Sequence, residues 1–184
     1  KGYLKQTITK DGDQMESPDE WNPSDFMDLM PVMVKVRIGG RDVKIQSWLY
    51  EQQGLTGGVV SILFLDTDVD GNAPDDRKIT DLLYGGDDRY RLKQEIVLGI
   101  GGIRMLDALG FNVRRCHLNE GHSSLLTLEL LRKNGMDADK VRNLCIFTTH
   151  TPVEAAFDKF PYDIINELMN DEVPIDILKK FGGE

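Results

Sequence analysis

Two strand-like segments, each followed by a helix-like segment, constrain the fold of this chain more than any other feature. A short strand is predicted at residues 113–117, and apolar residues at helical spacing predict a helix over residues 123–134. A second strand is predicted at residues 144–148, and a helical region opens at Pro152 and continues through residues 161–169. Strands that alternate with helices favour an α/β fold with a parallel sheet, in which a right-handed crossover joins the two strands.

The residues that precede these units predict a loop, a hairpin and a strand. Residues 11–31 are rich in Asp, Pro, Ser and Glu, which predicts a loop. Two alternating apolar runs within residues 32–50 are joined by Gly39-Gly40-Arg41. A β-hairpin is expected there, because glycine readily supplies the positive φ of a tight turn. The continuous apolar run at residues 59–65 is typical of a strand at the centre of a sheet.

A long helix is predicted over residues 91–109, and it contains three glycines within the stretch "GIGGIR" at residues 99–104. The stretch imitates the dinucleotide-binding motif G-x-G-x-x-G, but Arg104 stands at the third glycine and the stretch lies inside a helix. Each glycine costs a helix about 1 kcal/mol relative to alanine. The three glycines therefore predict that a neighbouring backbone packs closely against this helix.

The acidic stretch "DTDVDG" at residues 66–71 imitates the start of a calcium-binding EF-hand loop. Such a loop needs a bidentate glutamate at its twelfth position, which here is Arg77. The preceding apolar run is also strand-like and not helical. A solvated acidic loop is the favoured interpretation.

Polar side chains gather directly after both predicted strands, and they include all three histidines of the chain. In a parallel sheet these junctions lie at the carboxyl ends of the strands, the edge where open α/β sheets bind ligands. Helix N-termini there offer free N–H groups to acceptor oxygens. This set of donors, acceptors and one carboxylate suits a polyol such as a sugar. The candidate residues are His117, Asn119, Glu120 and His122 after the first strand and His150 and Thr151 after the second.

Simpler interpretations compete with a sugar site at some of these positions. His117 is favoured as a satisfied core histidine, and His122 could equally be a helix-capping residue. A zinc site built from Cys116, His117, Glu120 and His122 is disfavoured, because Cys116 and His117 are neighbours on a strand and point to opposite faces. No metal site is predicted.

His150 is the strongest candidate for a functional residue. Thr151 and Glu154 have the spacing of a capping box, and Pro152 suits the first position of a helix. This arrangement would fix His150 immediately before a helix N-terminus.

The stretch "YGGDDRYRLKQE" at residues 84–95 offers a third candidate. Its glycines give flexibility, and Asp87 and Asp88 could belong to a loop that gates a neutral site. The alternative is an acidic helix start stabilised by the helix dipole.

The net charge, the cysteines and the lengths of the apolar runs limit the kinds of partner and the location expected for this chain. The net charge of −9, with no local run of Lys or Arg, argues against a nucleic-acid surface. Cys116 and Cys145 are expected to be buried thiols and not a disulfide. No apolar run approaches the ~18 residues of a membrane span and no signal peptide is visible, so no membrane partner and a cytoplasmic location are expected. The chain begins at Lys1 without a methionine, so a piece of a longer protein is expected.

Five stretches together resemble the α-glucan (glycogen and maltodextrin) phosphorylases, above all their compact bacterial and archaeal branch. They follow one another almost from end to end: "GYLKQTITKDGDQ", "LDTDVDGNAPDDRKITDLLYGGD", "RLKQEIVLGIGGIRMLDALG", "HLNEGHSS" and "FTTHTPVEAAFDKFP". The resemblance implies a GT-B glycosyltransferase in which residues 1–184 form part of the Rossmann-like N-terminal domain. This part would comprise the loop at 11–31, a β-hairpin insertion at 32–50 and an α/β core with a parallel sheet at 59–184.

The resemblance also implies an activity for the parent enzyme. The family transfers the terminal α-1,4-linked glucose of a glucan to inorganic phosphate and releases glucose 1-phosphate with retention. Pyridoxal 5'-phosphate is held by a lysine outside this chain, so no cofactor-binding residue is expected within it. The remainder of the parent polypeptide is an expected partner, and a homo-oligomer is an open alternative.

Several residues take roles from this resemblance. His150 would contact the glucose, partly through its backbone carbonyl, and would be the catalytic candidate. Glu120 and His122 would line the same pocket, and Asp87 and Asp88 would belong to the gating loop. One departure is Ala156-Phe157, where the family is expected to carry a Gly-His pair. The alternatives are a nucleotide-sugar-dependent glucan synthase of the same architecture and a non-catalytic carbohydrate-binding lobe.

Overall fold

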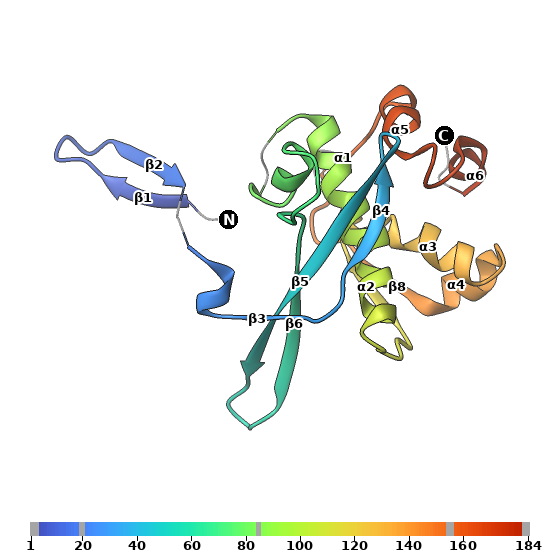
Figure 1. Cartoon of the computed structure of the whole chain (residues 1–184), viewed down its shortest axis with the longest axis horizontal. Helices are drawn as coiled ribbons and strands as arrows, with labels where there is room; N and C mark the ends of the chain where they lie inside the picture. The colour runs from blue at the N-terminus through green and yellow to red at the C-terminus, as the bar shows by residue number, and fades with distance from the viewer. Residues whose placement is uncertain (1–3, 19–20, 84–85, 154–156, 182–184) are drawn as a thin grey trace.

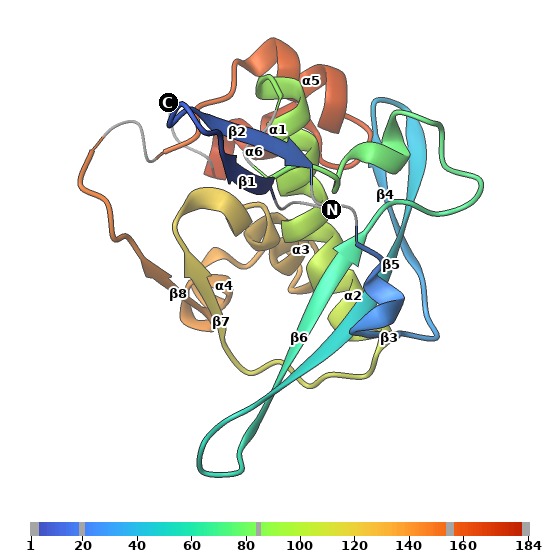
Figure 2. The ribbon, with the colours of Figure 1, turned by 90° about the vertical axis from the view of Figure 1, so that its left-hand side faces the viewer.

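The computed structural model describes residues 4–18, 21–83, 86–153 and 157–181. The fold is α/β, as predicted. A central helical column lies between an antiparallel sheet on one side and a parallel pair of strands with its helices on the other (Figure 1, Figure 2). Within the described ranges, no helix has the length and apolar character needed to cross a lipid bilayer.

An N-terminal hairpin is formed by β1 (Leu4–Ile8) and β2 (Gln14–Pro18), which pair antiparallel and extend away from the rest of the chain in Figure 1. The prediction of a loop over residues 11–31 is therefore wrong in part. Asp11-Gly12 is a hairpin turn signal, and Gly12 has a φ of 88° in the turn. The other elements in this range are η1 (Pro23–Asp25) and β3 (Asp28–Leu29).

The second hairpin consists of β4 (Val34–Ile38) and β5 (Arg41–Gln53). Gly39 and Gly40 alone form its turn, with φ values of 54° and 77°, because Arg41 already belongs to the strand. Positive φ at both central positions defines a turn whose twist matches that of the strands. The predicted hairpin is confirmed, and the side chains that it buries are Val36, Ile38, Val43 and Ile45.

β6 (Val59–Asp66) pairs antiparallel with β5 and is mostly exposed. The prediction that this run is a buried central strand is wrong for the described structure. A run that is apolar on both faces suits a strand covered on both faces. Within the described residues, β6 is paired only with β5, along one edge, and its two faces are largely uncovered. Its exposed side chains include Val59, Val60, Ile62 and Phe64.

The central column runs through α1 (Asp88–Ile96), a π-helical turn η3 (Val97–Gly101) and α2 (Gly102–Ala108), which confirms the predicted long helix. The expected close approach of a backbone occurs at Gly99. A Cβ atom added there would lie 2.7 Å from the backbone nitrogen of Leu126.

The parallel pair consists of β7 (Cys116–Asn119) and β8 (Cys145–Thr148), which confirms the predicted parallel arrangement. Side chains alternate along β7, so that Cys116 and Leu118 are buried while His117 and Asn119 are exposed. Both cysteines are free thiols, Cys116 buried and Cys145 only partly so. The crossover between the strands contains η4 (Gly121–Ser123), α3 (Leu126–Lys133) and α4 (Ala138–Leu144).

The helix predicted to open at Pro152 is wrong for the described residues, because 151–153 and 157–161 are not helical. Glu154 and Ala156 lie outside the described residues. The next helix is α5 (Tyr162–Met169), preceded by Pro161, and α6 (Ile175–Phe181) follows.

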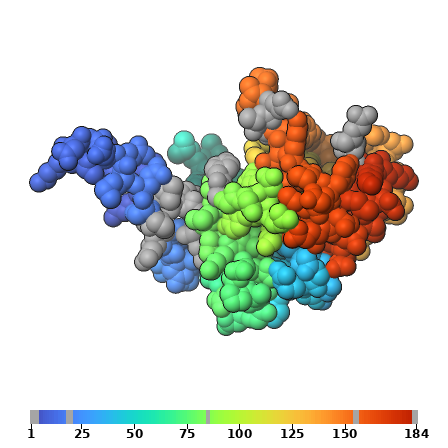
Figure 3. Space-filling view, turned by 90° about the horizontal axis from the view of Figure 1, so that it is seen from above, coloured from blue at the N-terminus to red at the C-terminus, as the bar shows by residue number. Residues whose placement is uncertain are grey.

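The C-terminal helices pack beside the turn of the second hairpin, as Figure 3 shows from above. Gly39 N–H donates to the backbone oxygen of Leu168 in α5 at 3.0 Å.

Candidate functional site

Glu120 is the residue from which the candidate site is built, directly after β7. Its N–H continues the parallel ladder by donating to the backbone oxygen of Thr148 at 2.9 Å. Its own backbone has a φ of 59° and a ψ of −167°, a region that is almost restricted to glycine and costs about 1–3 kcal/mol for other residues. Such a conformation persists where the surroundings hold it, and here it turns a buried carboxylate toward the end of β8.

The carboxylate of Glu120 binds the backbone that follows β8. Its Oε1 accepts hydrogen bonds from the N–H groups of His150 and Thr151, the latter at 3.2 Å. These donors, His150 first, hold the pKa of the Glu120 carboxyl below its usual range. Its Oε2 is buried and has no hydrogen-bond partner within the described structure. The predicted capping box cannot be followed beyond Thr151, because its partner Glu154 lies outside the described residues.

His150 and Asn119 meet across the ends of the two strands. The ring Nε2 of His150 lies 2.6 Å from the side-chain oxygen of Asn119, and both residues are exposed. The prediction that the two strand ends share one edge is confirmed by this contact and by the bonds to Glu120.

His117 has a different position. It points away from the core, and its Nε2 lies 2.6 Å from the hydroxyl of Thr148. The interpretation of His117 as a core histidine is wrong, because the alternation along β7 puts Cys116 and Leu118 on the buried face instead.

His122 lies in η4, two residues beyond Glu120, and contacts a charged cluster instead of capping a helix. Its Nδ1 lies 2.8 Å from Nη2 of Arg91 and 3.4 Å from a carboxylate oxygen of Asp158. The same Nη2 donates to Asp158 at 3.0 Å, and the carboxyl of Glu95 lies in this group as well.

A cavity of about 580 Å³ opens beside these residues. The cavity runs along β7, where His117 and Asn119 line it, and continues to His122 and Ser123 beyond the strand, while β6 and the central column supply apolar walls. Asn119 thus contributes to the cavity that His122 lines and also contacts His150, which connects the two strand junctions.

Asp87 and Asp88 lie at the start of α1. Asp87 caps this helix, because its side chain accepts a hydrogen bond from the N–H of Tyr90 at 2.9 Å. Tyr84 and Gly85, the start of the predicted gating loop, lie outside the described residues.

The described side chains bring together one group that could share a metal ion: Glu95, His122 and Asp158. The guanidinium of Arg91 already contacts His122 and Asp158. A fixed positive charge at this point opposes a further cation. Of the four residues considered above for a zinc site, Cys116 and His117 face opposite sides of β7.

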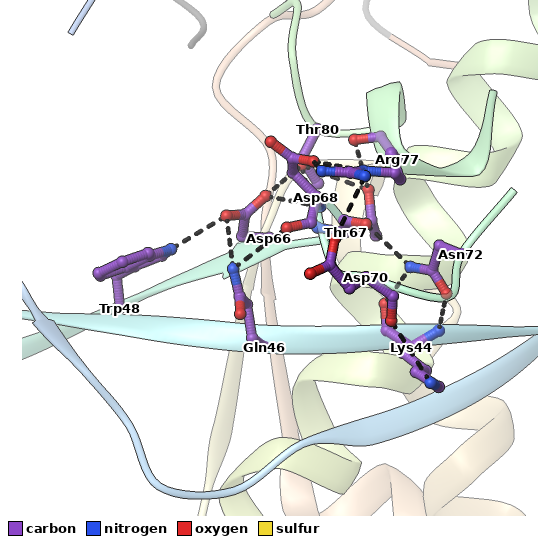
Figure 4. Close-up of polar contacts among 10 residues, drawn as sticks. All are labelled: Lys44, Gln46, Trp48, Asp66, Thr67, Asp68, Asp70, Asn72, Arg77 and Thr80. Carbon is purple, nitrogen blue, oxygen red and sulfur yellow. Dashed lines mark hydrogen bonds and ion pairs between the residues drawn. The ribbon is translucent and has the colours of Figure 1, made fainter. Parts of the chain in front are cut away.

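The acidic loop that imitates a calcium site is a hydrogen-bond network (Figure 4). The buried carboxylate of Asp66 accepts from the indole N–H of Trp48 at 3.0 Å and from the hydroxyl of Thr80 at 3.3 Å. Arg77, in the short helix η2 (Asp76–Lys78), donates to Asp68 at 2.6 Å. The interpretation as a solvated loop is therefore wrong for Asp66, which is bound by protein donors.

Arg91, Glu95 and Asp158 are the residues of this region that sequence reasoning missed. One signal was present, since Glu95 falls on the apolar stripe of its helix between the buried Leu92 and Ile96. An acid on a buried stripe indicates a paired or protonated group.

Comparison with known proteins agrees with the resemblance of the motifs, although no family model matches the chain. The chain is 41% identical to the maltodextrin phosphorylase of Thermococcus litoralis over 87% of its length, and 36% identical to the glycogen phosphorylase of Mycobacterium tuberculosis over 93%. It is 34% identical to the glycogen phosphorylase of Aquifex aeolicus over 97%. These alignments span 20%, 22% and 28% of the respective relatives. The chain is therefore similar, over most of its length, to a segment of the glycogen and maltodextrin phosphorylases, in agreement with the resemblance of its motifs.

Proposed function

We propose that the chain forms the sugar-facing part of an α-glucan phosphorylase. The parent enzyme transfers the terminal α-1,4-linked glucose of a glucan to inorganic phosphate and releases glucose 1-phosphate with retention. The observation that carries the proposal is the contact of His150 with both Asn119 and Glu120 at the shared edge of β7 and β8. This contact joins His150 and Glu120, to which the family resemblance gives places in the sugar pocket, with Asn119, a candidate from its position after β7.

The residues of this chain bind and orient the sugar. His150 presents its ring and backbone carbonyl to the glucose, while Glu120 fixes that backbone through two N–H groups. Asn119, His122 and Thr151 offer further donors and acceptors to hydroxyl groups. Asp87 and Asp88 belong to the segment that gates access.

The architecture is proposed to be GT-B, in a cytoplasmic enzyme. Pyridoxal phosphate, when bound in the parent enzyme, supplies acid/base chemistry to inorganic phosphate through its phosphate group. The resemblance assigns its lysine to a part of the parent outside this chain, so none of the residues named above is proposed to hold it.

The exposed apolar face of β6 supports a further part of the proposal, namely that more of the parent polypeptide packs against this segment. Val60, Ile62 and Phe64 are exposed, whereas Leu63 and Leu65 of the same strand line the cavity. Monomeric proteins rarely expose contiguous apolar surface of this kind unless it forms an interface.

The test is a phosphorolysis assay of the full-length protein with maltodextrin and phosphate. We expect release of glucose 1-phosphate, and a loss of kcat/KM of about 10²-fold or more in the His150→Ala variant, because a lost positioning contact has effects of this size. His117→Ala is the matched control, since this histidine lies on the same pair of strands, its ring contacts the hydroxyl of Thr148, and the family resemblance gives it no sugar contact.

Two results would contradict the proposal. One is full activity of His150→Ala. The other is transfer from a nucleotide sugar without phosphorolysis, which would identify a glucan synthase. The 184-residue chain alone is expected to be inactive.

A further inference from the structure

Glu95 is a buried acid to which the proposed function gives no role. It lies on the inner stripe of α1 and is 4% exposed. Its Oε1 is buried and has no hydrogen-bond partner within the described structure. An ionised carboxylate in this position would lack the solvation that it has in water.

The surroundings of Glu95 contain one acid, one cation and one histidine, from three parts of the chain. Asp158 comes from the segment before α5, His122 from η4, and Arg91 from the preceding turn of α1. Single carboxylate or imidazole atoms of Glu95, Asp158 and His122 all lie within 4.8 Å of one another. Arg91 donates to Asp158 at 3.0 Å and lies 2.8 Å from His122.

These neighbours favour a state in which the carboxyl groups of Glu95 and Asp158 hold one proton between them. Burial, and then the hydrogen bond and charge of Asp158, raise the pKa of Glu95 to about 9. Burial also acts to raise the pKa of Asp158, but hydrogen bonds from Glu95 and Arg91 lower it overall. Of two adjacent carboxyl groups, the more buried one keeps the proton and the other, beside the guanidinium, carries the charge.

We propose that Glu95 is a positioning residue, a neutral carboxylic acid that donates a hydrogen bond to Asp158 and so fixes Arg91 and His122 at the sugar-facing edge. Asp158 is the link, because it lies in the segment that connects β8 to α5 and receives bonds from α1. The neutral acid therefore ties the segment after His150 to the central column. This role in sugar binding rests on the proposed function, whereas the protonation of Glu95 does not.

The matched variants are Glu95→Gln and Glu95→Ala in the full-length protein. Glutamine retains an N–H donor for Asp158 at the same length and has no proton to lose. Alanine removes the donor and leaves space beside Asp158.

The first measurement is infrared spectroscopy at increasing pH. We expect wild-type protein to show a protonated-carboxyl band at neutral pH that disappears near pH 9, the value to which the pKa is raised. The band should be missing from Glu95→Gln. Identical spectra of the two proteins at neutral pH would overturn the proposal.

The second measurement is maltodextrin binding by calorimetry. Glu95→Gln should bind like wild type at neutral pH and should retain its affinity above pH 9, where wild type weakens. Glu95→Ala should bind at least about tenfold more weakly, because small displacements of positioning groups have large effects. Unchanged binding by Glu95→Ala, or a parallel alkaline loss in Glu95→Gln, would overturn the positioning role. Absence of phosphorolysis in a protein that shows the expected spectra and binding would contradict the proposed reaction alone.

Discussion

Replacing Gly99 by alanine tests whether the central helix sets the position of the segment that carries His122. An added Cβ would lie 2.7 Å from the backbone nitrogen of Leu126 and 3.0 Å from the backbone carbon of Leu125. Real Cβ atoms essentially never approach within 3.0 Å of another heavy atom. Since both neighbours are backbone atoms, no side-chain rotation can relieve the contact, and the start of α3 must move.

The size of the effect follows from two opposing contributions. Alanine in a helix is about 1 kcal/mol more favourable than glycine. Overpacking of a close contact costs about 1–3 kcal/mol, and the rigid partners here place Gly99→Ala toward the upper end. The expected net loss of unfolding free energy is about 1–2 kcal/mol.

Gly102→Ala is the matched control, because this glycine lies three residues further along the same column. Its added Cβ would meet nothing closer than a side-chain carbon of Leu65 at 3.8 Å. The helix preference then acts alone, and this variant should gain about 0.5–1 kcal/mol. The two variants should therefore differ by about 2 kcal/mol.

Urea unfolding of both variants measures this difference through the transition midpoints at an unchanged slope. Equal midpoints, or a Gly99→Ala variant as stable as wild type, would refute the reasoning that the close backbone approach constrains this junction.

Two further predictions concern stability. Between the ordinary pKa of 4.5 and about 9, folded Glu95 keeps a proton that the unfolded chain has lost. Its contribution to stability therefore falls as pH rises, and the advantage of Glu95→Gln over wild type should grow by up to about 1.4 kcal/mol per pH unit in this window. Unfolding midpoints measured across the window check this, and a pH-independent difference would contradict it. Asp66→Ala leaves the donors of Trp48 and Thr80 unsatisfied and should cost about 1–3 kcal/mol, whereas Asp70→Ala, at a fully exposed side chain, should change stability by less than about 0.5 kcal/mol. Equal thermal midpoints for these two variants would show that the network in Figure 4 contributes nothing.

Much of the fold could be predicted because its signals are local. The Gly39-Gly40 turn, the helical column and the two strand–helix junctions each depend on neighbouring residues. The errors arose where distant contacts decide. Residues 151–153 are not helical, and the backbone of Thr151 is instead bonded to Glu120, 31 residues away. The apolar run at residues 59–65 suits a strand that is covered on both faces. Whether other segments cover these faces depends on contacts between distant parts of the polypeptide, which the local sequence does not reveal.

The candidate site shows the same division. Asn119, Glu120 and His150 could be identified because they follow predicted strands, and parallel strands end at one edge. The cluster around Glu95 could not be identified in this way, because Arg91 and Asp158 are 67 residues apart. Its one local signal, an acid on a buried helical stripe, does not indicate which partner it meets.

The most direct test of the account is a structure of the full-length protein with a bound maltooligosaccharide. The terminal glucose is predicted to lie within hydrogen-bond distance of His150, on the edge formed by β7 and β8, with His122 in the same pocket. An oligosaccharide bound in the active cleft with neither histidine in reach would contradict the central claim that this edge recognises the glucan.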